Sequence, residues 1–239
     1  MTAKLSLTEI AKLIDHSLLS PLLTDEELIQ GCRIARQYNT ATVCIKPSAV
    51  LLAKSCLEGS GVTIGTVVAF PHGSTDTSIK IRETERAFAN GAREIDMVIN
   101  IGKALSEDWD YIAAEIQAVN DTVLYHGGLL KVIFETDYLQ EKHIAKLCEI
   151  CVAKEVAFVK TSTGYNYSRR PDGTYSYLGA TEACIKLMYK ICHPMVRVKA
   201  AGNIRTLDDL LKFHEWGAAR IGTSATESIL LEAKHRGQH

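Results

Sequence analysis

The sequence lacks the features that mark several large classes of protein. No apolar stretch approaches the roughly 20 residues of a membrane-spanning helix. The N-terminal segment MTAKLSLTEIAKLID has no apolar core of the kind found in signal peptides. The net charge is only −1 and like charges form no runs, so nothing indicates nucleic acid or a membrane as a partner. We therefore expect a soluble protein of the cytoplasm that binds neither.

The sequence also lacks a cysteine or histidine pattern that would indicate disulfides or a metal. Its seven cysteines are odd in number and the chain is not a small secreted scaffold, so we expect reduced thiols. Cys148 and Cys151 form a CxxC pair, but they lie inside a segment with helical spacing, 141–155, without a second ligand pair nearby. Of the eight histidines, only His16 and His72 fall near expected strand ends. We expect no metal and no cofactor.

A repeating alternation predicts the fold. Short apolar runs, each followed by a polar turn, alternate with longer segments of helical spacing, which is typical of a parallel sheet covered by helices. The eight runs are centred near Leu13, Val43, Val67, Met97, Val132, Val159, Val198 and Ile221. Eight such units in 239 residues predict an α/β protein with a single (β/α)8 barrel, or TIM barrel, as one domain over residues 1–239.

Helix signals refine this prediction. Thr24 and Glu27 form a capping box that starts one helix, and Gly91 ends another. Residues 1–12 predict an extra helix at the bottom of the barrel. A doubly wound open sheet is the alternative fold, but the GxGxxG fingerprint typical of that fold follows none of the eight runs.

Polar residues that end the apolar runs are the candidate site residues, because barrel active sites lie at the carboxyl ends of the strands. They are Asp15, Lys46, His72, Asp96, Asn100, Glu135, Lys160, Thr161, Ser162, Thr163, Lys199 and Gly202.

Lys160 and Lys199 end runs that are expected to be neighbouring strands. A lysine inside a barrel loses hydration, which favours the neutral amine, and a second ammonium nearby acts in the same direction. A neutral amine can attack a carbonyl and form an iminium, an electron sink that permits carbon–carbon cleavage. Asp96 alternates with Ile95 and Met97, so it could hold Lys199 charged or pass protons through a water. Two alternatives stay open, namely lysines that snorkel to solvent and a structural ion pair.

Two turns of small residues suggest a phosphate site. Gly202 and Asn203 follow the seventh run, and Gly222, Thr223 and Ser224 follow the eighth and open a helix. Backbone N–H groups at a helix N-terminus bind anions, and barrels often place phosphate after strands 7 and 8. The turns could equally be ordinary connections between strand and helix.

A set of motifs resembles one family over nearly the whole chain, in order from Asp15 to Ser224. The motifs are IDHSLL, VCIKP, VVAFPHG, GAREIDMVINIG, FVKTSTG, VKAAGNIRT and RIGTSA, and the family is deoxyribose-phosphate aldolase. The resemblance implies a class I aldolase on a (β/α)8 barrel. Such an enzyme reversibly cleaves 2-deoxy-D-ribose 5-phosphate to D-glyceraldehyde 3-phosphate and acetaldehyde, a step of deoxyribonucleotide catabolism.

The resemblance also implies a role for each site residue. Lys160 is the Schiff-base lysine, Lys199 is the second lysine that lowers its pKa, and Asp96 is the proton-transfer partner. The residues expected to contact the substrate are Asp15, Cys44, Thr163, Gly164, Gly202, Asn203, Gly222 and Ser224. We expect a homodimer.

Three features depart from the family pattern. Asn203 stands where the family often has a second glycine; asparagine tolerates left-handed backbone geometry but adds bulk beside the phosphate. The loop between Gly164 and Gly179 is longer than usual, and its Arg169 and Arg170 suit a phosphate or a carboxylate, so we expect a lid. Some family members end in a tyrosine that reaches the active site, whereas the last tyrosine of this chain is Tyr189.

Alternatives to these expectations remain. The long loop could be a solvated hairpin without a role. Asn203 and the loop leave open a related Schiff-base aldolase that acts on a different phosphorylated sugar. A catalytically silent barrel that binds a phosphorylated metabolite is the third possibility.

Overall fold

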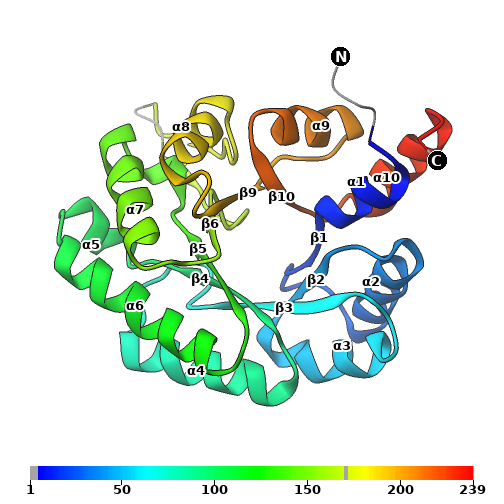
Figure 1. The fold of residues 1–239 in the computed structure, drawn as a ribbon, viewed down its shortest axis with the longest axis horizontal. Coiled ribbons are helices and arrows are strands. Elements are labelled where there is room, and N and C mark those ends of the chain that lie inside the picture. Colours follow the sequence, from blue (N-terminus) through cyan, green and yellow to red (C-terminus); the bar gives the residue numbers. More distant parts are fainter. Residues whose placement is uncertain (1–4, 170–171, 239) are drawn as a thin grey trace.

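Eight parallel strands form a closed barrel in the computed structural model, which describes residues 5–169 and 172–238 (Figure 1). Around the barrel the order is β1, β10, β9, β6, β5, β4, β3 and β2. Their bounds are β1 Ile14–Leu18, β2 Thr42–Ile45, β3 Thr63–Val68, β4 Glu94–Val98, β5 Leu129–Ile133, β6 Phe158–Lys160, β9 Arg197–Ala201 and β10 Ala218–Thr223. The predicted barrel is confirmed. The open-sheet alternative is wrong, because β1 pairs with β10 and closes the sheet.

Helices surround the barrel, and each barrel strand is followed by at least one (Figure 1). The α-helices are α1 Leu7–Leu13, α2 Asp25–Tyr38, α3 Val50–Leu57, α4 Thr77–Asn90, α5 Ile101–Leu105, α6 Trp109–Tyr125, α7 Glu141–Ala153, α8 Glu182–Cys192, α9 Leu207–Glu215 and α10 Thr226–His235; two 3-10 turns, η1 Pro47–Ala49 and η2 Thr136–Tyr138, follow β2 and β5. The capping box at Thr24 and Glu27 and the left-handed stop at Gly91 are present as predicted.

The extra N-terminal helix is α1, which runs directly into β1 and packs on α10 and β10. It begins at Leu7, and residues 1–4 of the predicted segment lie outside the described residues. Cys148 and Cys151 are free thiols buried on α7, as expected for structural residues. In the part of the chain that the structure describes, no helix has both the length and the apolar character needed to cross a bilayer.

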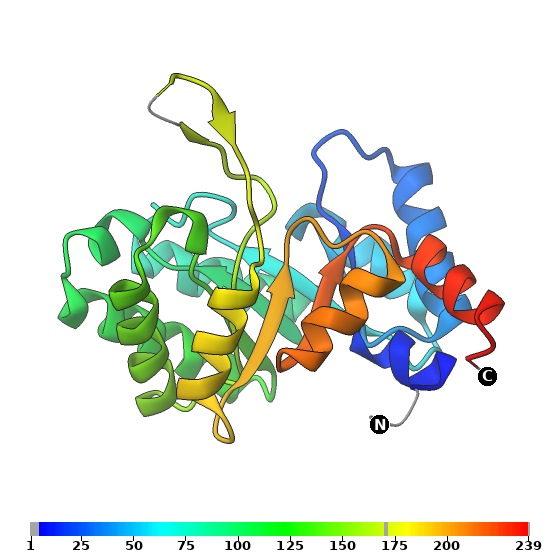
Figure 2. The same cartoon turned by 90° about the horizontal axis from the view of Figure 1, so that it is seen from above.

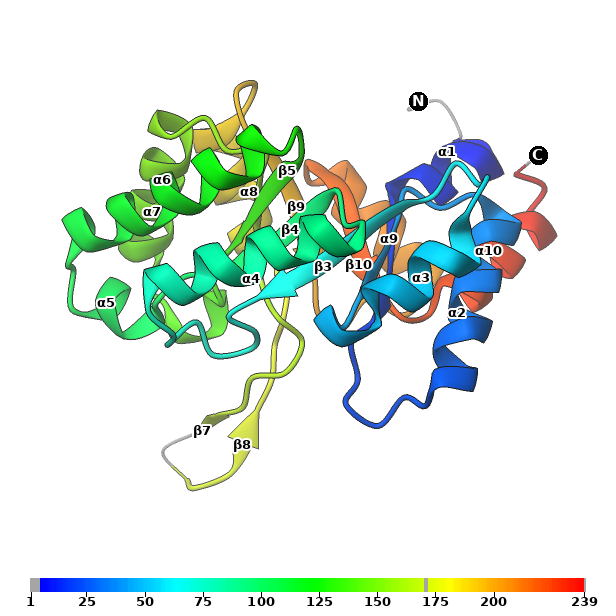
Figure 3. The ribbon, with the colours of Figure 1, turned by 90° about the horizontal axis from the view of Figure 1, so that it is seen from below.

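The long loop after β6 forms a hairpin of two short antiparallel strands, β7 Ser168–Arg169 and β8 Tyr175–Ser176. The hairpin projects away from the barrel on the side where the strands end (Figures 2 and 3). Its base, rather than its tip, therefore lies at the barrel mouth. The side chain of Arg169, and Arg170 as a whole, fall outside what the structure describes, so their part in a lid stays a prediction.

A buried ion pair outside the barrel fixes the strand that carries Asp96. Lys80 Nζ on α4 lies 2.7 Å from Glu115 Oε1 on α6, and both side chains are fully buried. Lys80 also donates to the Val98 carbonyl at the end of β4, at 2.8 Å. The other carboxylate oxygen, Glu115 Oε2, accepts from the N–H of Asn100 at 3.0 Å. The pair therefore joins two helices to the last residues of β4.

Replacing Glu115 by alanine leaves the Lys80 amine buried without its carboxylate. Loss of one partner of a buried pair costs roughly 3–5 kcal/mol, so Glu115→Ala should lower the free energy of unfolding by about that amount in chemical denaturation. Glu149→Ala removes a carboxylate from an exposed pair with Lys146, and its expected cost is below about 1 kcal/mol. Equal effects of the two substitutions would contradict this account.

Candidate active site

Lys160 and Lys199 meet inside the barrel because of the strand register. Lys160 is the last residue of β6 and is paired directly with Lys199 on β9. In a parallel sheet, residues in register point to the same face. The two side chains are almost completely buried, with 2% and 1% of their residue surface exposed. The alternative that these lysines snorkel into solvent is therefore wrong.

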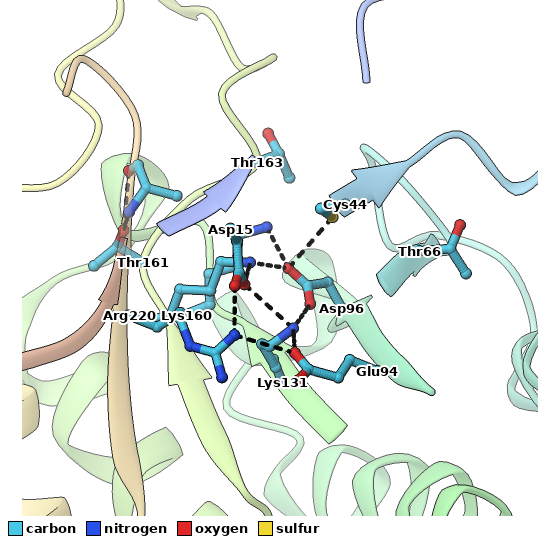
Figure 4. A network of polar contacts seen from close by, with 12 residues as sticks. Asp15, Cys44, Thr66, Glu94, Asp96, Lys131, Lys160, Thr161, Thr163 and Arg220 are labelled. Carbon is cyan, nitrogen blue, oxygen red and sulfur yellow. Dashed lines mark hydrogen bonds and ion pairs between the residues drawn. The ribbon is translucent and has the colours of Figure 1, made fainter. Parts of the chain in front are cut away.

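Two carboxylates, those of Asp15 and Asp96, contact these lysines, and Figure 4 shows Asp96 beside Lys160. Asp96 Oδ2 accepts from Lys160 Nζ at 2.8 Å and from Lys199 Nζ at 2.7 Å. Asp15 Oδ2 accepts from Lys199 at 2.5 Å. Asp15 lies on β1, and its carboxylate points into the barrel.

Two further cations complete the network. Lys131 Nζ on β5 lies 2.8 Å from Asp96 Oδ1 and 2.6 Å from Glu94 Oε2. Arg220 Nη1 on β10 lies 2.5 Å from Asp15 Oδ1. The network thus holds four basic side chains, those of Lys131, Lys160, Lys199 and Arg220, and three carboxylates, those of Asp15, Glu94 and Asp96.

The carboxylates are shared unequally among the cations. Lys199 contacts two carboxylates and Lys131 contacts three, whereas Lys160 contacts Asp96 alone, through the oxygen that Lys199 also uses. If Lys160 is neutral, three positive charges face three negative ones. Burial of net charge is costly, so the network favours the neutral amine at Lys160.

The directions of the pKa shifts agree with this count. Burial lowers the pKa of Lys160; Asp96 opposes that shift and the Lys199 ammonium reinforces it, and the net change is a lowering. Burial also disfavours a charged Lys199, but Asp15 and Asp96 outweigh it and raise the pKa of Lys199. Burial alone would raise the pKa of Asp96, yet Lys131, Lys160 and Lys199 hold it well below its usual range. The pKa values of these two lysines, which are paired in register, are therefore shifted in opposite directions.

Lys131, Glu94 and Arg220 were not among the site residues expected from the sequence, although the alternation of residues along their strands indicates that they point into the barrel. Glu94 precedes Asp96 by two positions and Arg220 precedes Gly222 by two, so the strand alternation places each pair on one face. Lys131 is an isolated charge within the apolar run of β5. The candidates were taken from the ends of the apolar runs, whereas these three residues lie earlier in their strands, further from the barrel mouth.

One cavity of about 670 Å³ opens above the network at the carboxyl ends of the strands. Lys160 and Lys199 reach its floor, and Asp96 is fully buried beneath them. All eight residues expected to contact the substrate line it, namely Asp15, Cys44, Thr163, Gly164, Gly202, Asn203, Gly222 and Ser224. Cys44 lies 3.9 Å from Asp96 through its sulfur, and burial raises the pKa of Cys44 to about 11, so it remains a thiol.

One side of the cavity gathers the two small-residue turns. Gly202 and Asn203 after β9 and Ser224 after β10 line this side together, at the start of α10. Arg205 lines the same side with an exposed side chain, and the sequence reasoning missed it. Backbone N–H groups beside a guanidinium form a site suited to a phosphate.

Asn203 connects this turn to the long loop. Its backbone has φ of 58°, the left-handed geometry that asparagine tolerates. Its side-chain amide donates to the carbonyls of Tyr177 and Leu178 at 3.2 and 3.0 Å. Two departures from the family pattern, Asn203 and the long loop, are therefore in contact with each other.

Glu135 orients the turn that follows Lys160. It is buried with φ of 61° and accepts from the Thr163 N–H at 3.2 Å, from the Thr163 hydroxyl and from Asn166 Nδ2 at 3.0 Å. Burial raises the pKa of Glu135 to about 7. Across residues 5–169 and 172–238, His, Cys, Asp and Glu side chains form no group of three or more that could hold a metal ion.

The fold is an α/β barrel, and its site holds two buried lysines in register at the floor of a cavity. The chain belongs to the DeoC/LacD family of aldolases, whose sequence model matches residues 9–224. It is 42% identical to a deoxyribose-phosphate aldolase of Rhodopirellula baltica, over 95% of this chain and 90% of the relative. It is likewise 42% identical to one of Caldanaerobacter subterraneus, over 97% and 96% of the two chains.

Solved structures show the same likeness. An aldolase called QR15 superimposes with a TM-score of 0.86 at 33% identity, over 95% of this chain and 97% of that one. The deoxyribose phosphate aldolase of Aeropyrum pernix, described as a tetramer, gives a TM-score of 0.85 at 26% identity, over 96% and 92% of the chains. The family and the barrel predicted from the sequence are therefore confirmed.

Replacing Lys199 by leucine should move the pH dependence of activity upwards. The substitution removes an ammonium beside Lys160 and leaves Asp15 and Asp96 with less positive charge, and both changes raise the pKa of Lys160. Activity needs the neutral amine, so the acidic limb of kcat/KM against pH moves to higher pH and activity at neutral pH falls. Lys199→Arg keeps the charge and should leave the limb near its wild-type position. An unmoved limb in Lys199→Leu would show that Lys199 does not control Lys160.

Proposed function

We propose that the protein is a class I aldolase that reversibly cleaves 2-deoxy-D-ribose 5-phosphate to D-glyceraldehyde 3-phosphate and acetaldehyde. The observation that carries the proposal is the position of Lys160 at the floor of the cavity. Among the four basic side chains of the network, Lys160 contacts the fewest carboxylates. The relatives named deoxyribose-phosphate aldolase support the substrate.

The first step forms a covalent bond between enzyme and sugar. The neutral amine of Lys160 attacks the C1 aldehyde of the open-chain sugar and gives a carbinolamine. Loss of its hydroxyl as water gives an iminium between Nζ and C1. The Lys199 ammonium, whose pKa is raised, is the acid beside Lys160 that can protonate the leaving hydroxyl.

The second step breaks the bond between C2 and C3. A base takes the proton of the C3 hydroxyl, its oxygen becomes the aldehyde of glyceraldehyde 3-phosphate, and the bonding electrons move to C2 to form an enamine. Protonation of C2 and hydrolysis of the iminium then release acetaldehyde and restore Lys160. Asp96, bonded to both lysines, is the proposed proton-transfer partner; its low pKa keeps it a carboxylate that accepts protons through Lys199 or a water.

The turns after β9 and β10 are proposed to bind the phosphate. Gly164, Gly202, Gly222 and Ser224 line the same cavity, and Arg205 supplies a positive charge at its rim. Lys160 and Lys199 lie at the cavity floor. A chain of five carbons with a terminal phosphate can thus place its aldehyde on Lys160 while the phosphate meets the turns. The phosphate would fix the distance of C1 from the nucleophile.

The assembly and location are also proposed. We expect a homodimer, since closed twofold dimers are the commonest oligomers of soluble proteins, although the Aeropyrum pernix relative is described as a tetramer. We place the enzyme in the cytoplasm, where free thiols such as those of Cys148 and Cys151 stay reduced.

Reductive trapping tests the function. The protein is incubated with 2-deoxy-D-ribose 5-phosphate, reduced with borohydride, digested and analysed by mass spectrometry. The expected result is an adduct on Lys160, because only a neutral amine in contact with the aldehyde forms an iminium that borohydride fixes. Lys160→Met should abolish both the adduct and the release of acetaldehyde.

An exposed lysine supplies the matched control. Lys146→Met removes an amine from the outer surface of α7, and trapping on Lys160 should be unchanged. An adduct formed only with another phosphorylated sugar would replace the proposed substrate. Absence of an adduct with any aldehyde, acetaldehyde included, would indicate a silent barrel and refute the proposal.

A further inference from the structure

The returning arm of the hairpin is held by the turns after β5 and β9, the two strands that flank β6 in the barrel. Asp137, in the turn after β5, accepts from the N–H groups of Leu178 and Gly179 at 2.8 and 3.1 Å. Asn203, in the turn after β9, donates to the carbonyls of Tyr177 and Leu178. Residues 177–179 are thus held from both sides, although the hairpin itself projects into solvent (Figure 2).

This arrangement places the Tyr177 ring between two of the glycines proposed to bind phosphate. A Cβ added to Gly202 would lie 2.0 Å from the Tyr177 hydroxyl, so only glycine fits there. A Cβ added to Gly164, on the opposite turn, would lie 3.6 Å from the same hydroxyl. Tyr177 also lines the cavity together with Arg205. Its hydroxyl therefore lies where the turns after β6 and β9 approach each other.

The Tyr177 hydroxyl is buried and has no hydrogen-bond partner among the described residues. Burial, together with the nearby carboxylates of Glu135 and Asp137, raises the pKa of Tyr177, so the group keeps its proton. A protonated hydroxyl is a donor, and a buried donor without an acceptor is unfavourable. An anion bound against Gly202 would supply that acceptor.

We propose that the Tyr177 hydroxyl donates a hydrogen bond to the phosphate of the substrate and helps the enzyme to select phosphorylated over unphosphorylated sugars. The proposal rests on the proposed function and adds a residue from the long loop to the phosphate site. In this view the hairpin contributes to the site through the fixed arm at its base, and the projecting tip is not needed for the contact.

The test compares two substrates. Tyr177→Phe removes the hydroxyl and keeps the ring. Loss of a hydrogen bond to a charged group corresponds to about tenfold to hundredfold in binding. KM for 2-deoxy-D-ribose 5-phosphate should rise by about that factor, whereas kcat/KM for unphosphorylated 2-deoxy-D-ribose should stay within about twofold of wild type. Trapping of acetaldehyde on Lys160 should also be unchanged, because acetaldehyde carries no phosphate.

Two further variants distinguish a direct contact of Tyr177 with the phosphate from a purely structural role. Tyr175→Phe changes an exposed hairpin tyrosine and should leave all three readouts at wild-type values. Asn203→Gly keeps the left-handed backbone but removes the amide that holds Tyr177 and Leu178. Its KM for the phosphorylated sugar should also rise, because Tyr177 is then held less firmly.

Each outcome decides the proposal. An unchanged KM for the phosphorylated sugar in Tyr177→Phe overturns it, because the hydroxyl would then contact nothing that matters for binding. Equal losses on both sugars also overturn it, since they would show a structural role. If wild-type protein forms no adduct with acetaldehyde, the proposed function fails instead, and the two failures are therefore distinguishable.

Discussion

Asp96 accepts hydrogen bonds from three lysines in the barrel interior. Because the carboxylate is shared, it stabilises the charged form of Lys160 less than an unshared carboxylate would, and the proposed chemistry depends on this. Lys131 takes one oxygen, and Lys199 shares the other with Lys160. Lys199 has a second carboxylate in Asp15, whereas Lys160 has none. The pKa values of two lysines in register on adjacent strands are thereby shifted in opposite directions, which supports the proposed roles of Lys160 as the nucleophilic amine and Lys199 as the acid.

Closure of the barrel is what allows this arrangement. Asp15 lies on β1 and Asp96 on β4, and both accept a hydrogen bond from Lys199 on β9, so residues of three strands of the closed ring meet at one point. In an open sheet, the strands that carry these residues would not all face one axis. The same closure brings the turns after β6, β9 and β10 to one cavity above the network. Fold and site are therefore linked through the buried charges. Loss of any one of the three carboxylates would leave an excess of buried positive charge, which the barrel interior tolerates poorly.

The strands, the helix ends at Thr24 and Gly91, and the pair Lys160 and Lys199 could be predicted, because each depends on a local pattern: apolar runs, caps and charges at the ends of runs. Local pattern did not identify Glu94, Lys131 and Arg220 as site residues. A charged residue inside an apolar run points into or out of the barrel depending on the strand register, and the tertiary structure sets that register. We expected the long loop to form a lid. Among its described residues, the hairpin projects outward, and Tyr165 and Tyr177 at the base line the cavity (Figure 3). That outcome depends on Asp137 and Asn203, which lie far from the loop in sequence, so local turn chemistry could not reveal it.

The most direct test of the central claim is the titration of Lys160 itself. Lysine side chains labelled with ¹³C at Cε can be followed by NMR against pH, with the Lys160 signal assigned by its absence from Lys160→Met. The account predicts that Lys160 titrates below the ordinary lysine pKa of about 10.4 and that Lys199 remains charged beyond it. Two results would contradict this prediction. One is a Lys160 pKa at or above the ordinary lysine value, and the other is a Lys199 that loses its proton at a lower pH than Lys160.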